Sequence, residues 1–257
     1  MHQMGTALRA RDRKHAHSWQ GVERRAAMTP YYEDDACTIY HGDAREFAGL
    51  IDADVVITDP PYGVGLTTKK NGYRRPGASG GYVEVPQASS VYPDDAEDVR
   101  SLIAAVFPPL LDRIGRALIY SGTTMLWAYP RASAVGCVFT PNGAGSSSWG
   151  FQTCHPILYY GKDPFLADGK GRRPNGFRTE QPNREDIDHP CPKPLKWMTW
   201  AVERASRPGE TVLDPFMGSG TTLVAAKLCG RKAIGIERQE AYCEIAAKRL
   251  AQGVLAL

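Results

Sequence analysis

The chain has 257 residues, of which 42% are hydrophobic and 23% charged, and its formal net charge is +3. This length allows one α/β domain with insertions and a large core. No run is long and apolar enough for a membrane helix, and the basic N-terminus lacks the apolar core of a signal peptide, so a cytoplasmic protein is predicted. The six cysteines form no Cys-x-x-Cys pair, which predicts reduced thiols and no metal site.

The first segments predict a disordered tail followed by the folded domain. Residues 1–27 are polar, basic and aperiodic, so the domain is expected to span residues 28–257. Residues 37–41 alternate like a strand, and a short helix is expected over residues 44–50. The apolar, β-branched run 54–58 is typical of a buried parallel strand. Two strands joined by a helix favour a right-handed βαβ unit.

The motif Asp59-Pro60-Pro61-Tyr62 follows that strand directly. Proline has no backbone N–H and a fixed φ, so the pair ends strand pairing and holds a rigid turn. The turn presents a carboxylate, the Pro60 carbonyl and an aromatic face at the carboxyl end of a strand, where open α/β sheets bind ligands. These groups suit a planar nucleobase with an exocyclic amine. A strand-ending turn with a packed tyrosine would fit the same residues.

Two long irregular segments are glycine-rich and basic. Residues 63–93 are predicted to be a mobile loop that closes over substrate and touches phosphates. Residues 161–189 are predicted to be an insert that reads the bases of a nucleic acid. The basic residues expected to contact nucleic acid in the two segments are Lys69, Lys70, Arg74, Arg75, Arg172, Arg173 and Arg178.

Regular elements are predicted between and after these segments. A helix capped by Asp94 is expected to be interrupted at Pro108-Pro109, and part of the segment 125–134 is expected to be helical. The remaining predictions are strands at 117–120, 155–160, 211–213 and 233–236, and helices from Pro194, over 221–229 and at the C-terminus.

A second site is predicted where a strand, a glycine-rich turn, a helix, a strand and an acid follow each other, an arrangement that binds nucleosides. Gly218 and Gly220 let the backbone approach a ligand, and Glu237 can accept both ribose hydroxyls. A dinucleotide motif would need glycine where Leu223 stands, and no Gly-Lys-Ser/Thr follows, so NAD and ATP are disfavoured. Asp214 suits a positively charged ligand such as a sulfonium or ammonium group.

Together, the Asp59 motif and the later run 214–222 resemble the S-adenosyl-methionine-dependent amino DNA methyltransferases. The catalytic motif comes before the cofactor motif, as in the circularly permuted β group of that family. His41-Gly42-Asp43 resembles the motif whose aspartate contacts the cofactor adenine. Residues 189–194 resemble the segment beside the methionine part, and residues 234–237 resemble the ribose-binding strand.

The resemblance implies an α/β fold with a Rossmann-like, doubly wound, mostly parallel sheet and short recognition insertions. It implies methyl transfer from S-adenosyl-methionine to double-stranded DNA without a metal. It leaves a homodimer and a restriction endonuclease partner open. The implied catalytic residues are Asp59, Pro60, Pro61 and Tyr62. The implied cofactor-binding residues are Asp43, Lys193, Asp214, Phe216, Gly218, Ser219, Gly220, Thr221 and Glu237.

The target base is predicted to be adenine, methylated at N6, because Asp59 occupies the position where the cytosine enzymes of this family mostly have serine. Cytosine N4 is the alternative, and a protein-glutamine or RNA amine methyltransferase is a further one. A nucleic-acid-binding module without catalysis would keep the same fold. The short recognition insert and His155, which replaces a frequent acidic residue, leave the target sequence open.

Overall fold

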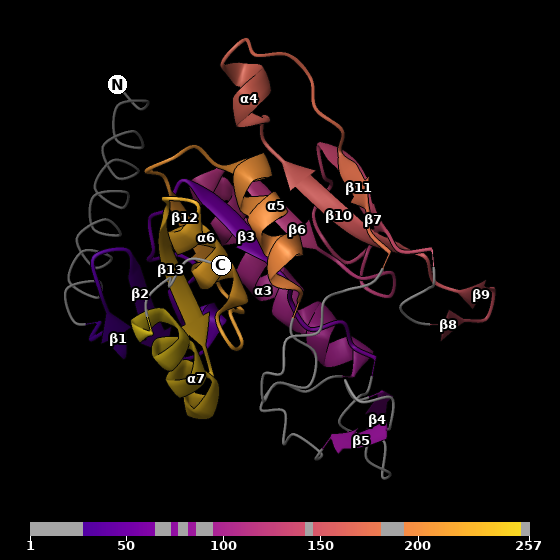
Figure 1. The fold of residues 1–257 in the computed structure, drawn as a ribbon, viewed down its shortest axis with the longest axis horizontal. Coiled ribbons are helices and arrows are strands. Elements are labelled where there is room, and N and C mark those ends of the chain that lie inside the picture. The colour runs from indigo at the N-terminus through magenta and orange to yellow at the C-terminus, as the bar shows by residue number, and fades with distance from the viewer. Residues whose placement is uncertain are drawn as a thin grey trace, which may run out of the picture.

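The computed structural model describes residues 28–64, 73–76, 82–85, 95–141, 146–180 and 193–252, with residues 73–76, 82–85 and 146–147 as backbone alone. One nine-stranded sheet runs through them in the order β1-β2-β13-β12-β3-β6-β10-β7-β11. The strands are, in that order, Tyr32–Glu33, Cys37–His41, Lys232–Glu237, Thr211–Asp214, Val55–Thr58, Ala117–Tyr120, Cys154–Tyr160, Ala134–Phe139 and Gly176–Arg178. Figure 1 shows this sheet through the middle of the molecule.

The five central strands β2, β13, β12, β3 and β6 are all parallel, so their carboxyl ends meet at one edge. We call this the catalytic edge. Strand β10 is antiparallel to β6 and to β7, and β11 is parallel to β7. The predicted α/β class with a mostly parallel sheet is confirmed.

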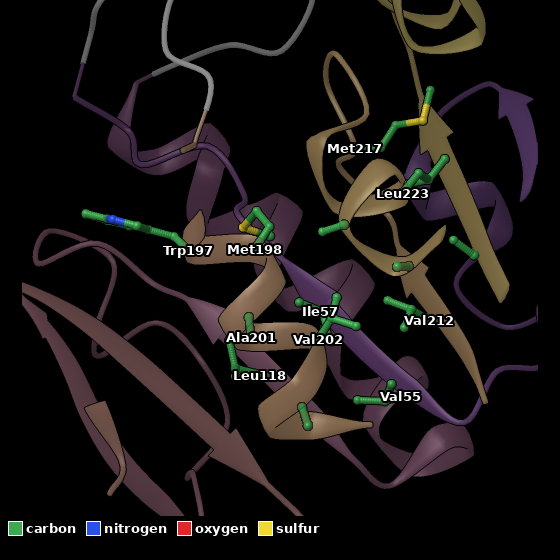
Figure 2. Packing of buried hydrophobic residues seen from close by; sticks show 14 of the residues in the cluster. Val55, Ile57, Leu118, Trp197, Met198, Ala201, Val202, Val212, Met217 and Leu223 are labelled. Atoms are coloured by element: carbon green, nitrogen blue, oxygen red, sulfur yellow. The ribbon is translucent and has the colours of Figure 1, made fainter. Parts of the chain in front are cut away.

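Helices cover both faces of the sheet (Figure 1). Side chains alternate along β3, so Val55 and Ile57 lie in one core cluster and Val56 lies in the other. Figure 2 shows Met198 and Val202 in the first cluster, together with Val55 and Ile57. Complete burial of an aliphatic side chain of this size contributes about 1.5–3 kcal/mol. The helices are α2 (Ala44–Phe47), α3 (Ala96–Ile114), α4 (Pro164–Ala167), α5 (Leu195–Ala205), α6 (Thr221–Leu228) and α7 (Glu240–Ala251).

Several predicted elements need correction. Helix α3 is not interrupted at Pro108-Pro109 but continues to Ile114 and ends at Gly115 in the left-handed conformation. Its N-cap is Asp95, whose carboxylate accepts from two backbone amides. The flanking side chains Phe107 and Leu110 are fully buried, and this packing offsets the hydrogen bonds that proline cannot donate.

The segment 125–134 contains turns rather than a helix, and strand β7 begins at its end. The insert 161–189 is not irregular throughout, because α4 and β11 lie within it. Within residues 63–93, β4 (Tyr73–Pro76) and β5 (Tyr82–Val85) pair as an antiparallel hairpin. A second small hairpin joins β8 (Ser146–Ser147) and β9 (Gly150–Phe151). The predicted tail, 1–27, lies outside the described residues.

Two cysteines also depart from the expectation of reduced thiols. Cys137 on β7 and Cys154 on β10 form a disulfide with a Cα–Cα distance of 5.7 Å. The strand register explains the pairing, because Cys154 lies opposite Phe139 and is therefore a diagonal neighbour of Cys137.

The described part of the chain contains no helix with both the length and the apolar character needed to cross a membrane. It also contains no cluster of three or more histidine, cysteine or acidic side chains that could hold a metal ion.

Candidate active site

The predicted motifs meet at the catalytic edge, where the central strands end. The catalytic turn, residues 59–62, follows β3, and Asp214 is the last residue of β12. Glu237 ends β13 and pairs with His41 on β2, just before Asp43. Motifs that are far apart in sequence are thus brought together because their strands are parallel neighbours.

The carboxylate of Asp59 is held by two donors from this site. The Tyr62 hydroxyl donates to Oδ1 of Asp59. The ammonium of Lys193 lies 3.0 Å from the same oxygen and donates to the Tyr62 hydroxyl at 2.6 Å. The Asp59 side chain is 22% exposed and that of Lys193 is 14% exposed, so the cluster lies in a recess that solvent still reaches. An acceptor in such a place suits a ligand that brings its own N–H donors.

The ring of Tyr62 lies against the turn after β6. A Cβ atom built on Gly122 would be 2.6 Å from Cδ1 of Tyr62, so only glycine fits there. The Lys193 ammonium lies 4.8 Å from the centre of the same ring. This contact was not predicted from the sequence, because a local pattern does not show which ring approaches Gly122.

The resemblance implies that Lys193 lies beside the methionine part of the cofactor, and this stays a prediction. Its Nζ atom contacts the catalytic turn and lies 5.7 Å from the Tyr120 ring centre. Nearby, burial and then the charge of Lys193 lower the pKa of His155 to about 4. The ring of His155 packs edge-on against Trp197 at 4.9 Å.

Asp214 is 2% exposed and organises the chain around the second motif. Its Oδ1 accepts from Thr58 at 2.6 Å and from the Phe216 amide at 3.0 Å, and its Oδ2 accepts from the Thr222 hydroxyl. Burial raises its pKa to about 6, although these hydrogen bonds oppose the shift. Thr58 immediately precedes Asp59, so one buried carboxylate links the two motifs. Sequence reasoning missed both threonines.

The glycine-rich turn uses left-handed backbone conformations, with φ of 51° at Gly218 and 81° at Gly220. The guanidinium of Arg249 on α7 donates to the Ser219 carbonyl at 2.7 Å and to the Thr221 hydroxyl at 3.1 Å. Arg249 thus braces the turn from the last helix. No local pattern in the sequence indicates this contact, because the residues are far apart.

Two further carboxylates lie at the carboxyl ends of the adjacent strands β13 and β2, where Glu237 is the last residue of β13 and Asp43 follows β2. Glu237 accepts from the amides of Gly218 and Gln239 at 3.1 and 2.8 Å, and burial raises its pKa. Asp43 caps α2 and pairs with Arg45, whose side chain lowers the pKa of this carboxyl. Carboxylate oxygens accept more than one hydrogen bond each, so both acids retain acceptor capacity for a nucleoside.

Phe216 is 8% exposed and packs against Phe107 of α3, with ring centres 6.1 Å apart. Its ring is therefore part of the core on one side. The site's acceptor groups fit the predicted cofactor. The two carboxylates at the ends of adjacent strands can accept hydrogen bonds from ribose hydroxyls and from an adenine amine, and the glycine-rich turn leaves space for close approach.

The residues predicted to bind nucleic acid are not all at the catalytic edge. Arg173 pairs with Asp163 at 2.6 Å and donates to the carbonyls of Glu203 and Arg204, at the end of α5. That helix end leads into the start of β12, so Arg172 and Arg173 lie at the opposite edge. Arg178 ends β11 opposite Phe139 and emerges at the catalytic edge. Lys69 and Lys70 lie outside the described residues, as do the side chains of Arg74 and Arg75.

Comparison with known proteins agrees with this geometry. The chain is 24% identical to the Type II methyltransferase M.ScaI of Streptomyces caespitosus, over 88% of this chain and 85% of that protein. It is 26% identical to the Type II methyltransferase M2.DpnII of Streptococcus pneumoniae, over 86% of this chain and 92% of that one.

Solved structures share the fold. The complex of M1.HpyAVI with SAM matches with a TM-score of 0.57 at 23% identity, covering 83% of this chain and 98% of that chain. The cytosine-N4-specific PvuII DNA methyltransferase matches with a TM-score of 0.61 at 16% identity, covering 87% and 89%. A family model described as DNA methylase matches residues 120–248, half of the sequence. The chain belongs to this DNA methylase family and is an S-adenosyl-methionine-dependent methyltransferase that acts on an amino group in DNA.

Proposed function

We propose that the protein methylates the N6 amine of adenine at a specific sequence in double-stranded DNA. The observation that carries this proposal is the arrangement at Asp59, where one carboxylate oxygen at a strand end faces two hydrogen-bond donors. An exocyclic amine is a donor of the same kind, and the carboxylate has further acceptor positions for it. The Asp59-Pro60-Pro61-Tyr62 motif ahead of the glycine-rich turn supports assignment to the β group.

The chain's own residues perform binding, orientation and proton acceptance. The amine of a paired base lies inside the duplex, so the target nucleotide must be flipped out to reach Asp59. The ring of Tyr62 then stacks on the base. Asp59 and the Pro60 carbonyl accept hydrogen bonds from the two N–H groups of the amine. This arrangement directs the lone pair of the amine nitrogen toward the cofactor side. Asp59 is also the base within reach of the proton that the amine releases.

The cofactor occupies the strand ends beside this turn in our proposal. S-adenosyl-methionine supplies, when bound, an electrophilic sulfonium methyl group. Glu237 would accept hydrogen bonds from the ribose hydroxyls, and Asp43 would accept one from the adenine amine. The turn through Gly218, Ser219, Gly220 and Thr221, which Glu237 and Arg249 hold by hydrogen bonds, would cover the ligand. Phe216 flanks this region, and Asp214 accepts a hydrogen bond from the Phe216 amide. Lys193, which contacts Asp59, is proposed to face the methionine part.

Cytosine N4 is the alternative target, because its exocyclic amine offers the same two donors. Digestion of plasmid DNA after incubation with the protein and isotope-labelled S-adenosyl-methionine, followed by mass spectrometry of the nucleosides, distinguishes the two. We expect the label in N6-methyladenine. Label in N4-methylcytosine would establish the alternative. If the folded wild-type protein placed label in neither base, the proposed reaction would be refuted.

The named relatives are Type II methyltransferases, and we infer that this protein likewise modifies one short sequence alongside a restriction endonuclease. A homodimer stays a prediction. Mapping of methylated positions in DNA from cells that express the protein would give the target sequence.

A further inference from the structure

Three large aromatic side chains are almost fully exposed in two segments that follow strands β6 and β7. Trp149 is 97% exposed, Trp127 is 89% exposed and Phe151 is 85% exposed. Aromatic side chains of this size are usually buried for most of their surface, and an exposed group of them marks a binding surface. Trp149 and Phe151 belong to the small hairpin of β8 and β9, which we call the aromatic arm (residues 146–151).

The strand register places this arm at the catalytic edge. Strand β10 runs antiparallel to β6, with Ile157 opposite Tyr120, the last residue of β6. The residues that precede β10 therefore extend past the end of β6, which is where Gly122 contacts the Tyr62 ring. In Figure 1 the strands β8 and β9 protrude from the body of the molecule beyond β7 and β10.

The base of the arm is fixed to the same region. The Gln152 side chain donates to the Thr123 hydroxyl at 2.7 Å, one residue after Gly122. The Thr140 amide donates to the Thr153 carbonyl at 2.8 Å, and the disulfide of Cys154 joins β10 to β7. The arm is thus anchored where it joins the sheet and carries exposed aromatic rings at its tip. This arrangement is suited to inserting a ring into a partner.

Trp127 belongs to a second segment, which contacts the chain just after the turn. It lies two residues after Met125, whose side chain is fully buried and would be 2.7 Å from a Cβ built on Gly63, the residue after Tyr62. Exposed aromatic groups thus arise from two segments. One is linked through Gln152 to Thr123, and the other contacts Gly63 through Met125.

We propose that Trp149 and Phe151 are a DNA-contacting element that stacks on bases beside the flipped nucleotide. The proposal rests on the proposed function, because a base can reach Asp59 only if the duplex lies along the catalytic edge. Flipping leaves a gap in the stack and exposes base faces, and aromatic rings fill such gaps and stack on any base. A second copy of the chain is the other occupant to consider, but the arm extends from the catalytic edge, along which the duplex must lie.

The test compares Trp149→Ala and Trp149→Phe with the wild type and with Leu166→Ala. Leu166 is also an exposed apolar residue, at 46%, but it lies on α4 away from the catalytic edge and serves as the matched control. The assays use plasmid DNA and labelled S-adenosyl-methionine, and they measure the methylation rate, the KM for DNA and the Kd for the cofactor.

We expect Trp149→Ala to weaken DNA binding and methylation about tenfold or more, as loss of one stacked base does. Trp149→Phe should keep most of the activity, Leu166→Ala should match the wild type, and cofactor affinity should stay unchanged in all. Unchanged DNA binding by Trp149→Ala would overturn the proposal. So would a wild-type dimer, measured by sedimentation, that Trp149→Ala dissociates without loss of DNA affinity. Failure of the wild type to methylate DNA would instead refute the proposed function.

Discussion

At the scale of single residues, Asp59 and the cofactor-side acids have separate partners, which predicts a division of labour. Asp59 contacts Tyr62 and Lys193, whereas Glu237 contacts the glycine-rich turn. We expect Asp59→Ala to abolish methyl transfer with nearly unchanged S-adenosyl-methionine affinity, because the turn is untouched. Glu237→Ala should instead lose a large part of its S-adenosyl-methionine affinity. Calorimetric titration of both variants decides, and a large loss of affinity in Asp59→Ala would contradict the division.

Lys193 provides a second test at this scale, because the resemblance implies a cofactor contact and the structure shows a contact with the catalytic turn. Its ammonium contacts Asp59 and the Tyr62 hydroxyl. If it acts there, Lys193→Met should lower kcat about tenfold or more, since Asp59 and Tyr62 lose the group that aligns them, while cofactor affinity changes little. The control is Lys196→Met, an exposed lysine three residues later in the first turn of α5. A selective loss of cofactor affinity in Lys193→Met would return the residue to the cofactor site.

Asp214 predicts a pH dependence of stability. Burial raises its pKa from 3.8 to about 6, so the carboxyl binds its proton more tightly in the folded protein than in the unfolded chain. Its contribution is therefore largest below pH 3.8 and is lost as the pH rises through 6. A shift of about two pKa units corresponds to about 3 kcal/mol. In Asp214→Asn this component should be absent, so that the difference in unfolding free energy from the wild type changes between pH 4 and 6. A constant difference across that range would contradict the raised pKa.

At the scale of elements, the glycine-rich turn depends on its contact with α7. Gly220 has a φ of 81°, and a Cβ built on it would lie 2.7 Å from Cβ of Ala246. Gly230 has a φ of 71° but no atom within 4 Å of the built Cβ, so it is a matched control for backbone strain alone. Both alanine variants should lose roughly 1–2 kcal/mol of stability through the left-handed conformation.

Gly220→Ala should lose a further 1–3 kcal/mol or so from the clash and should bind S-adenosyl-methionine more weakly, because α7 must shift away from the turn. Gly230→Ala should keep its cofactor affinity. Chemical denaturation and calorimetry measure the two effects. If both variants lost equal stability and kept their cofactor affinity, α7 would move away from the turn without loss of packing energy.

The elements also show what sequence can and cannot predict. The central strands and the helices α5 to α7 followed from apolar runs and glycine or proline boundaries, which are local signals. The continuation of α3 through Pro108-Pro109 could not be predicted, because burial of Phe107 and Leu110 decides it. Likewise, the contact of Lys193 with Asp59 and the hydrogen bonds of Thr58 and Thr222 to Asp214 join distant segments. Motifs therefore identified the site, while its internal contacts needed the fold.

At the scale of the whole molecule, the sheet separates the predicted recognition insert into two parts. Residues 161–175 begin after Tyr160, which pairs with Ala117 at the start of β6, so they lie at the edge opposite the catalytic turn. Strand β11 then runs parallel to β7 and carries the chain back toward the catalytic edge. A duplex placed for base flipping at Asp59 would meet the end of β11 before it met α4.

This separation predicts different effects for two exposed arginines in that insert. Arg178 ends β11 at the catalytic edge, and its 2.8 Å ion pair with Glu180 is exposed on both sides and contributes little to stability. Arg172 is equally exposed but lies beside Arg173, whose contacts with the end of α5 fix that stretch at the opposite edge. Arg178→Ala should therefore weaken DNA binding, whereas Arg172→Ala should behave as the wild type.

The kind of loss shows what Arg178 contacts. A bidentate contact to a base is worth about 1–3 kcal/mol, and its loss relaxes the methylated sequence at one position. A phosphate contact would instead lower methylation of all targets equally and reduce the salt dependence of binding. Methylation mapping of a target library with both variants, at two salt concentrations, separates these results. If Arg172→Ala changed the target and Arg178→Ala did not, the duplex would have to reach the opposite edge of the sheet, and the orientation proposed for DNA would be wrong.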